Sequence, residues 1–227
     1  MPPPLDFLFP HEIGMELIYS FVIIFCSLMI YRATKEMYEL SSYKGIKYFR
    51  MSFLFFAIAY FFRYFINFFL VLFASPEANI FSGYIFLISL FVFMYSSAMA
   101  VFYLLYSVMW KKWNHSRQKI YLFSILSAII AIIGTLFRGI EVSLLLNLIF
   151  LIFAFIILLI AYKDSKKKHK EKSLFAIYLL LFIFWVLNVI DILLPKFLQV
   201  YQILIYLASI SLFMIILYKV LKKAGSD

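Results

Sequence analysis

Residues 51–74 read MSFLFFAIAYFFRYFINFFLVLFA, and this apolar stretch decides the fold of the chain. It is longer than the roughly 20 residues that a helix needs to cross a hydrocarbon core about 30 Å thick. One charge, Arg63, lies about halfway along it. An intramembrane arginine costs about 2.5–3.5 kcal/mol on insertion scales unless it finds a partner. The contacts of Arg63 are therefore the central question that the sequence raises.

The composition of the whole chain is that of a membrane protein. Its 227 residues are 66% hydrophobic and 14% charged, whereas soluble domains are roughly 45–50% apolar and about 25% charged. The single cysteine, Cys26, excludes a disulfide framework and a cysteine zinc site. The HExxH, GxSxG, GxGxxG and P-loop patterns are absent from the sequence. We therefore expect no enzyme, no metal and no cofactor.

Seven apolar stretches predict an all-α bundle of seven transmembrane helices in a single domain, residues 1–227. We expect the spans at residues 11–31, 51–74, 84–109, 120–137, 143–162, 173–194 and 198–218. The polar stretch 32–50 is expected as a connecting loop with a short interfacial helix, in preference to a docking site for a partner. In the fourth span, small residues recur every three or four positions and predict a helix-packing seam: Ser124, Ser127, Ala128, Ala131 and Gly134.

Basic residues predict the orientation of the bundle. The loops after the first, third and fifth spans hold five, four and six of them and the tail holds three, which makes 18 of the 21. By the positive-inside rule the amino terminus is outside and the carboxyl terminus inside. We expect a multi-pass protein of a cell membrane, with a prokaryotic plasma membrane favoured.

This topology accounts for most of the net charge of +10, so nucleic acid is not an expected partner. The expected partner is the lipid bilayer. The stretch from Lys163 to Lys172, KDSKKKHKEK, is predicted to contact anionic lipids, at about 1 kcal/mol per basic residue near the surface.

Polar residues inside the spans gather in the predicted outer half. At 1.5 Å per residue, Arg63 lies about 18 Å from the inner boundary, slightly past the midplane. Asn67 lies one turn further on the same face, and Asn188 and Asp191 share one face of the sixth span. These positions predict an outward-facing polar pocket. Its candidate residues are Arg63, Asn67, Asp191, Asn188, Glu16, Arg138 and Glu141.

Two interpretations of Arg63 follow from this asymmetry. In the first, Arg63 holds a small anionic ligand or a lipid, or pairs with Asp191 or Glu16 in a switchable ion pair, because intramembrane charges are functional candidates by default. In the second, Arg63 forms a structural salt bridge that only fixes helix packing. The sequence leaves both interpretations open.

Three functions remain open, and a sensor or receptor-like protein is favoured. Its basic inner loops would pass a signal to a cytoplasmic partner, as in the seven-span input modules of prokaryotic signalling proteins, to which the chain is similar at the level of fold only. A small-solute transporter with a three-plus-one-plus-three repeat is an alternative. That repeat rests on S-x8-F-x5-N in the second and sixth spans, which ends at Asn67 and Asn188. The third is a non-catalytic structural subunit of a membrane complex.

A retinal-binding protein is not expected. Such proteins share the seven-span plan but need a lysine in the middle of the last span for the Schiff base. Residues 198–218 contain no lysine, and Lys219 follows at the inner end.

Overall fold

A computed structural model describes the chain over residues 10–72, 79–110, 112–113, 117–137, 140–167, 172–194 and 199–225. Seven α-helices make up nearly all of this described part, which confirms the prediction of an all-helical chain with seven apolar helices. The helices are α1 (Pro10–Ser41), α2 (Lys44–Leu72), α3 (Asn79–Met109), α4 (Arg117–Leu136), α5 (Ile140–Lys167), α6 (Lys172–Leu193) and α7 (Gln199–Ala224).

The predicted loop at residues 32–50 is wrong, because this stretch is mostly helical. Residues 32–41 continue α1 and residues 44–50 begin α2, so only residues 42–43 lie between the two helices. Its long polar side chains favour helix, and Lys35 and Glu39 form an ion pair of 3.7 Å one turn apart. Tyr48 and Phe49 are buried. The chain reverses at Ser42, which has a φ of 51°.

Each of the seven helices is long and apolar enough to cross a membrane, with a mean hydropathy between 1.3 and 3.2. Large apolar side chains also cover the outside of the bundle. On α4, for example, the exposed face includes Ile125, Ile129, Ile132 and Leu136. Monomeric soluble proteins rarely expose continuous apolar surface of this kind. These features indicate a multi-pass membrane protein.

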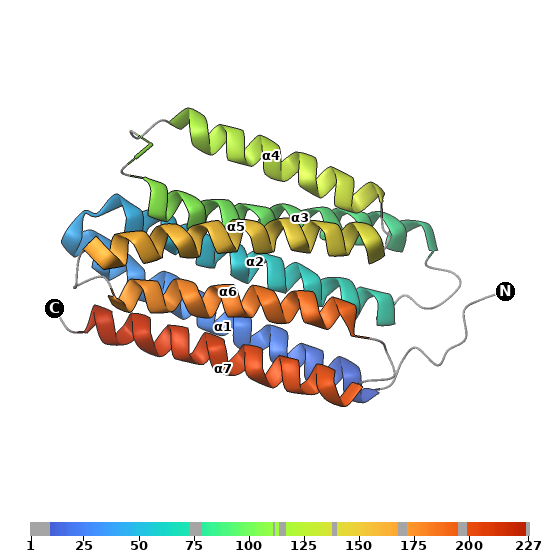
Figure 1. Ribbon diagram of the computed structural model, residues 1–227. Coiled ribbons are helices and arrows are strands. Elements are labelled where there is room, and N and C mark those ends of the chain that lie inside the picture. Colours follow the sequence, from blue (N-terminus) through green and yellow to red (C-terminus); the bar gives the residue numbers. More distant parts are fainter. Residues whose placement is uncertain are drawn as a thin grey trace.

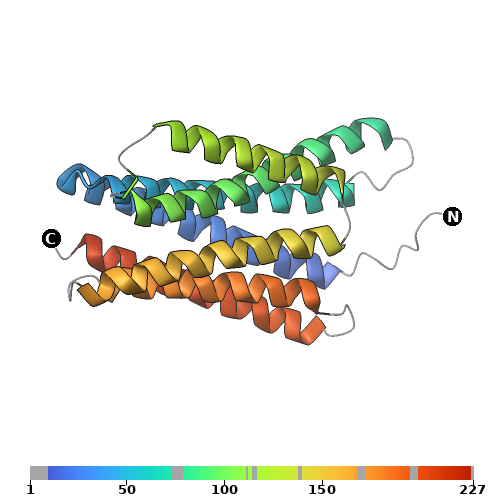
Figure 2. The same cartoon turned by 45° about the horizontal axis from the view of Figure 1, so that its top comes forward.

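Six helices form a closed ring, and α4 lies outside it. Around the ring, α1 packs against α2, α2 against α3, α3 against α5, α5 against α6, α6 against α7, and α7 against α1. The helix α4 packs on α3 and touches α5 (Figure 1). A second view shows the same outer position of α4 and the roughly common axis of all seven helices (Figure 2).

The bundle has two chemically different ends. One end holds the turn between α1 and α2, the last turns of α3, α5 and α7, and the first turns of α4 and α6 (left in Figure 1). We call it the basic end, because most lysines and arginines of the described residues lie there. The opposite end, where α1, α5 and α7 begin and α2 and α6 finish, is called the Arg63 end.

Small residues allow α4 to approach the ring closely, as the sequence predicted. Ser127 and Ala131 are fully buried. A Cβ atom on Gly134 would lie 3.1 Å from Leu146 of α5 and 3.4 Å from Met94 of α3. The predicted seam on the fourth span is therefore confirmed as a packing surface.

Aromatic side chains fill the middle of the ring. Phe56 of α2, Phe184 of α6 and Phe213 of α7 are all buried. Their ring centroids lie 4.8 Å (Phe184–Phe213), 6.2 Å (Phe56–Phe213) and 6.3 Å (Phe56–Phe184) apart, in edge-to-face arrangements. Such pairs contribute about 0.5–1.5 kcal/mol beyond their buried area. This aromatic core joins α2 to α6 across the ring and separates the two ends of the bundle.

Candidate functional site

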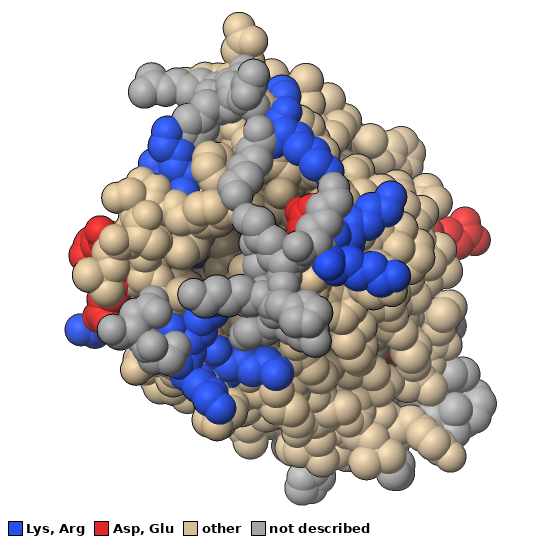
Figure 3. All heavy atoms as spheres, turned by 60° about the vertical axis from the view of Figure 1, so that its left-hand side comes forward, with Lys and Arg blue, Asp and Glu red and all other residues tan. Residues whose placement is uncertain are grey.

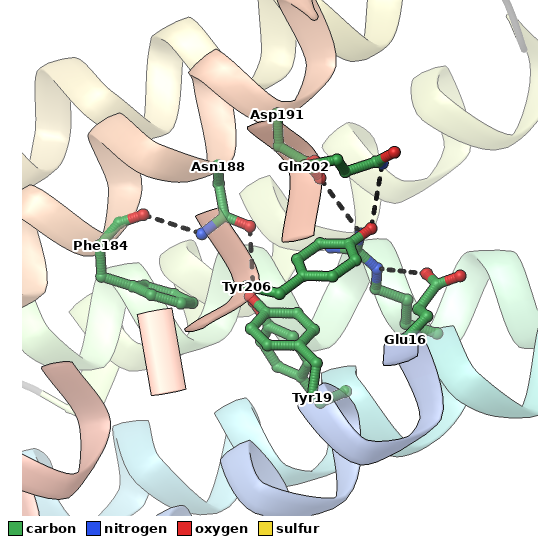
Figure 4. Close-up of polar contacts among 9 residues, drawn as sticks. Glu16, Tyr19, Phe184, Asn188, Asp191, Gln202 and Tyr206 are labelled. Carbon is green, nitrogen blue, oxygen red and sulfur yellow. Dashed lines mark hydrogen bonds and ion pairs between the residues drawn. The ribbon is translucent and has the colours of Figure 1, made fainter. Parts of the chain in front are cut away.

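Three charged side chains from three helices meet near the Arg63 end. Arg63 Nε of α2 lies 3.6 Å from Glu16 Oε1 of α1, and Arg63 Nη2 lies 3.7 Å from Asp191 Oδ2 of α6. The exposed fractions of the side chains are 25% for Arg63 and Glu16 and 10% for Asp191. We call these three residues the Arg63 cluster. Figure 4 shows Glu16 and Asp191 on opposite sides of this cluster.

The formal charges of the Arg63 cluster do not cancel. One guanidinium faces two carboxylates, which leaves a net charge of −1 when all three groups are ionised. Both ion-pair distances exceed those of charge-assisted hydrogen bonds, which are about 2.7–2.9 Å. In addition, Asp191 Oδ1 is buried and lies within 3.5 Å of no donor among the described residues, although the Gln202 side chain interacts with this carboxylate. A buried carboxylate oxygen without a partner is costly, so the cluster can accept a further positively charged group or donor.

A layer of tyrosines lies directly beneath the cluster, on the side of the aromatic core. The Tyr19 and Tyr60 hydroxyls are 2.9 Å apart, and Tyr60 donates to Asn188 Oδ1 at 3.4 Å. Asn188 Nδ2 in turn donates to the Phe184 carbonyl oxygen, one turn earlier in α6, at 2.9 Å. These hydrogen bonds connect α1, α2 and α6 a second time, and Figure 4 shows the two bonds of Asn188.

Tyr206 brings α7 into the same layer. Its ring stacks on that of Tyr19 with centroids 4.8 Å apart and an angle of 15° between the planes. Gln202, one turn earlier in α7, donates to the Tyr206 hydroxyl at 3.1 Å. The Arg63 guanidinium carbon lies 5.9 Å from the centre of the Tyr60 ring, within the range of a cation–π interaction. The tyrosine layer, defined as Tyr19, Tyr60 and Tyr206, thus supports the cluster from below.

The structure brings four of the seven predicted residues together. Glu16, Arg63 and Asp191 form the cluster, and Asn188 lies one turn below Asp191 in the tyrosine layer. Glu141 is exposed in the first turn of α5 and is not among the described ion-pair partners of Arg63. Asn67 and Arg138 lie outside the residues whose side chains the structure describes.

Sequence reasoning missed Tyr19, Tyr60, Tyr206 and Gln202. Helical spacing was the available signal, because Tyr19 follows Glu16 by three residues and Tyr60 precedes Arg63 by three. Residues three or four apart share a helix face. With 17 tyrosines in the chain, that spacing alone did not single them out.

A cavity lined by described residues lies at the basic end, whereas the sequence placed a polar pocket at the Arg63 end. Its volume is about 470 Å³, and all six helices of the ring contribute to its walls. Figure 3 shows the basic end from outside, with lysine and arginine side chains gathered around a hollow. Residues of the Arg63 cluster do not line this cavity.

Among the described residues, no group of three or more histidine, cysteine, aspartate or glutamate side chains could hold a metal ion. The two carboxylates of the Arg63 cluster are already paired with a guanidinium.

The chain is 32% identical to an uncharacterized protein of Archaeoglobus fulgidus over 229 aligned positions, which cover 97% of this chain and 95% of the relative. No model of a known protein family matches the sequence. No solved structure matches it either. The chain belongs to the same family as the Archaeoglobus protein.

Proposed function

We propose that the protein is a receptor-like membrane sensor in which the Arg63 cluster is the ligand-responsive element. The single observation that carries this proposal is the sharing of one guanidinium by two carboxylates from two other helices, at 3.6 and 3.7 Å. A ligand that weakens one of these two ion pairs also weakens the contacts that hold α1, α2 and α6 together. An intramembrane charge cluster is a functional candidate by default.

Charge favours a small cation as the ligand. The sequence alone assigned an anionic group to Arg63, but an anion has to compete there with two carboxylates. A cation instead neutralises the net charge of −1 and gives the buried Asp191 Oδ1 a closer partner than the described residues supply. As the cation draws a carboxylate away from Arg63, the cluster loosens. A ligand shifts a conformational equilibrium only if it binds the two conformations with different affinity. Here the cation binds the conformation in which a carboxylate has left Arg63 more tightly than the conformation in which the ion pair is intact.

The orientation of the sensor follows from the positive-inside rule. The basic end faces the cytoplasm and the Arg63 end faces outward, so the ligand comes from outside. Four helices reach from the cluster and the tyrosine layer to the basic end: α1, α2, α6 and α7. In this proposal their movement alters the basic surface that a cytoplasmic signalling protein contacts. Anionic lipids are the other partner proposed for that surface.

Thermal unfolding of the purified protein tests the ligand proposal. A panel of primary amines, other small organic cations and small anions is added to wild type, to Asp191→Asn and to Glu141→Gln. We expect at least one cation to raise the unfolding temperature of wild type and Glu141→Gln but not of Asp191→Asn. Glu141 is the matched control, because it is an exposed carboxylate at the same end. Equal stabilisation of Asp191→Asn by that cation contradicts the proposed site.

A small-solute transporter is the second candidate, and the position of the cavity favours it. The bundle has a cavity at the basic end, while ion pairs hold the Arg63 end together. This combination is what a carrier open to one side requires. The position of α4 outside the ring also leaves two sets of three helices, α1–α3 and α5–α7, as a three-plus-one-plus-three repeat needs. Against transport, the ring helices run unbroken through the described residues, whereas transport sites usually use broken helices.

Thiol labelling separates the two candidates. Asn188→Cys in a Cys26→Ser background places one cysteine in the tyrosine layer. A transporter exposes this cysteine to both sides in turn, so a membrane-impermeant thiol reagent reacts with it from either side. A sensor leaves it reactive from the Arg63 end at most.

A further inference from the structure

The walls of the cavity at the basic end are apolar in its inner part and charged at its mouth. Its inner walls are apolar and include Phe49 of α2, Ile177 of α6 and Val220 of α7. Its two charged lining residues, Asp164 and Lys223, belong to the last turns of α5 and α7. The cavity is thus apolar inside and charged where the helices end.

Polar groups on the inner walls are mostly occupied by the protein itself. Ser107 Oγ donates to the Leu104 carbonyl oxygen at 2.7 Å and lies 2.9 Å from the Tyr178 hydroxyl. Thr34 Oγ1 donates to the Ile30 carbonyl oxygen at 2.6 Å. Because these hydroxyl groups already bond within the protein, the inner part of the cavity has few groups that need a hydrogen bond from a polar ligand. An apolar chain therefore suits the inner part of the cavity better than a sugar or a nucleotide does.

The surface around the mouth is strongly positive. Among the described residues, the acidic side chains at the basic end are Glu36, Glu39 and Asp164. They are outnumbered by lysines, and Figure 3 shows lysine and arginine side chains spread over this end. The lysines whose side chains the structure describes there are Lys35, Lys44, Lys47, Lys112, Lys119, Lys163, Lys166, Lys219, Lys222 and Lys223. A field of one sign at the mouth of a low-dielectric cavity attracts ligands of the opposite charge.

We propose that the cavity at the basic end binds an anionic amphiphile, with its apolar chain inside and its anionic head beside Lys223. The volume of about 470 Å³ lies within the range of ligand sites, about 300–1,000 Å³. The position of the cavity also suits such a ligand. At the predicted membrane boundary, the apolar chain of the amphiphile contacts the apolar walls, and its anionic head group lies among lysines. A membrane lipid and a free fatty acid share this chemistry. The site is separate from the Arg63 cluster and goes beyond the sensor function.

Binding of oleate, compared with oleyl alcohol, tests the need for an anionic head. Both are titrated against the purified full-length protein with unfolding temperature and tryptophan fluorescence as readouts. We expect oleate to bind at least about tenfold more tightly than the alcohol. In Lys223→Gln, oleate affinity falls about fivefold, the size of one partly exposed charge contact, whereas Lys222→Gln binds as wild type does. Lys222 is the matched control, because it is exposed and does not line the cavity. Equal losses in the two variants, or equal binding of the alcohol, overturn the head-group assignment.

Filling the cavity tests whether the apolar chain of the ligand binds inside it. Ala161→Phe on α5 and Ile46→Trp on α2 each put a large side chain on the cavity wall. We expect either variant, if folded, to lose most oleate binding, and two variants on different helices guard against a folding failure. A folded variant of either kind that binds oleate like wild type overturns the cavity assignment.

Lipid nanodiscs separate the two sources of the ligand. If phosphatidylglycerol nanodiscs block oleate binding and phosphatidylcholine nanodiscs do not, the natural occupant is a membrane lipid. If oleate binds equally in both, the occupant is a free amphiphile. Asp191→Asn retains oleate binding in either case, so failure of the sensor proposal and failure of this one are distinguishable.

Discussion

Arg63 is a charge that the membrane tolerates because of its neighbours. Two carboxylates within 3.7 Å and the Tyr60 ring at 5.9 Å replace part of the water that the guanidinium loses. The tyrosine layer then holds the helices that carry these groups.

Arg63→Ala should destabilise the protein because it leaves two carboxylates without their cation. We expect a loss of about 2–3 kcal/mol, below the ~3–5 kcal/mol of a fully buried pair, since a quarter of the side chain is exposed. Chemical unfolding in detergent measures it. Arg63→Ala with Asp191→Asn should recover part of the loss, because the double variant removes one unpaired charge. A double variant less stable than the single one contradicts the ion pairing.

Tyr60→Phe isolates the hydroxyl bridge of the tyrosine layer. The variant keeps the ring but removes the 2.9 Å contact with Tyr19 and the 3.4 Å bond to Asn188. We expect a loss of about 1–2 kcal/mol, because one net hydrogen bond contributes about 1 kcal/mol and Asn188 Oδ1 loses its donor. Unfolding in detergent measures it, with Tyr218→Phe on the exposed surface of α7 as the control. Equal stability of the two variants contradicts the role assigned to the bridge.

At the scale of elements, the turn between α1 and α2 depends on Gly45. A Cβ atom there would lie 2.5 Å from the Tyr43 ring and 2.9 Å from Trp110 Nε1 of the segment after α3. Those two rings pack edge to face, with centroids 4.9 Å apart. A Cβ atom on residue 45 would therefore require the Tyr43 and Trp110 side chains to shift where α3 approaches this turn.

Gly45→Ala and Gly14→Ala should have opposite effects, although both glycines are helical. Crowding at Gly45 typically costs about 1–3 kcal/mol. At Gly14 a Cβ atom meets nothing within 4 Å, so alanine is expected to stabilise α1 by up to about 1 kcal/mol. Thermal unfolding of the two variants measures the difference. A Gly45→Ala protein as stable as Gly14→Ala contradicts the close packing at the turn.

At the scale of the whole molecule, the proposed orientation has a direct test. Reporter fusions to the carboxyl terminus compare a fluorescent protein, which matures inside the cell, with alkaline phosphatase, which is active outside. We expect fluorescence and no phosphatase activity, because 18 of the 21 basic residues belong to the loops and tail that the positive-inside rule assigns to the inner side. The opposite result reverses the outward-facing site and the cytoplasmic partner together.

The whole ring connects two chemically different ends. The Arg63 cluster ties the helices at one end, and the aromatic core of Phe56, Phe184 and Phe213 ties them in the middle. At the basic end the same helices part around a cavity. A bundle that is tied at one end and hollow at the other is consistent with both a sensor and a carrier, which is why the labelling experiment at Asn188 matters.

The sequence by itself determined the number of helices, because the length and hydropathy of each span are local properties. It also indicated the packing face of α4 through Ser127, Ala131 and Gly134. It misjudged residues 32–50, where buried contacts of Tyr48 and Phe49 turn a polar stretch into helix. It named Glu16 and Asp191 as alternative partners of Arg63, whereas the structure brings both within 3.7 Å. Only the tertiary structure decided that pairing, the tyrosine layer and the cavity, because each depends on which helices are neighbours around the ring and how far their ends diverge.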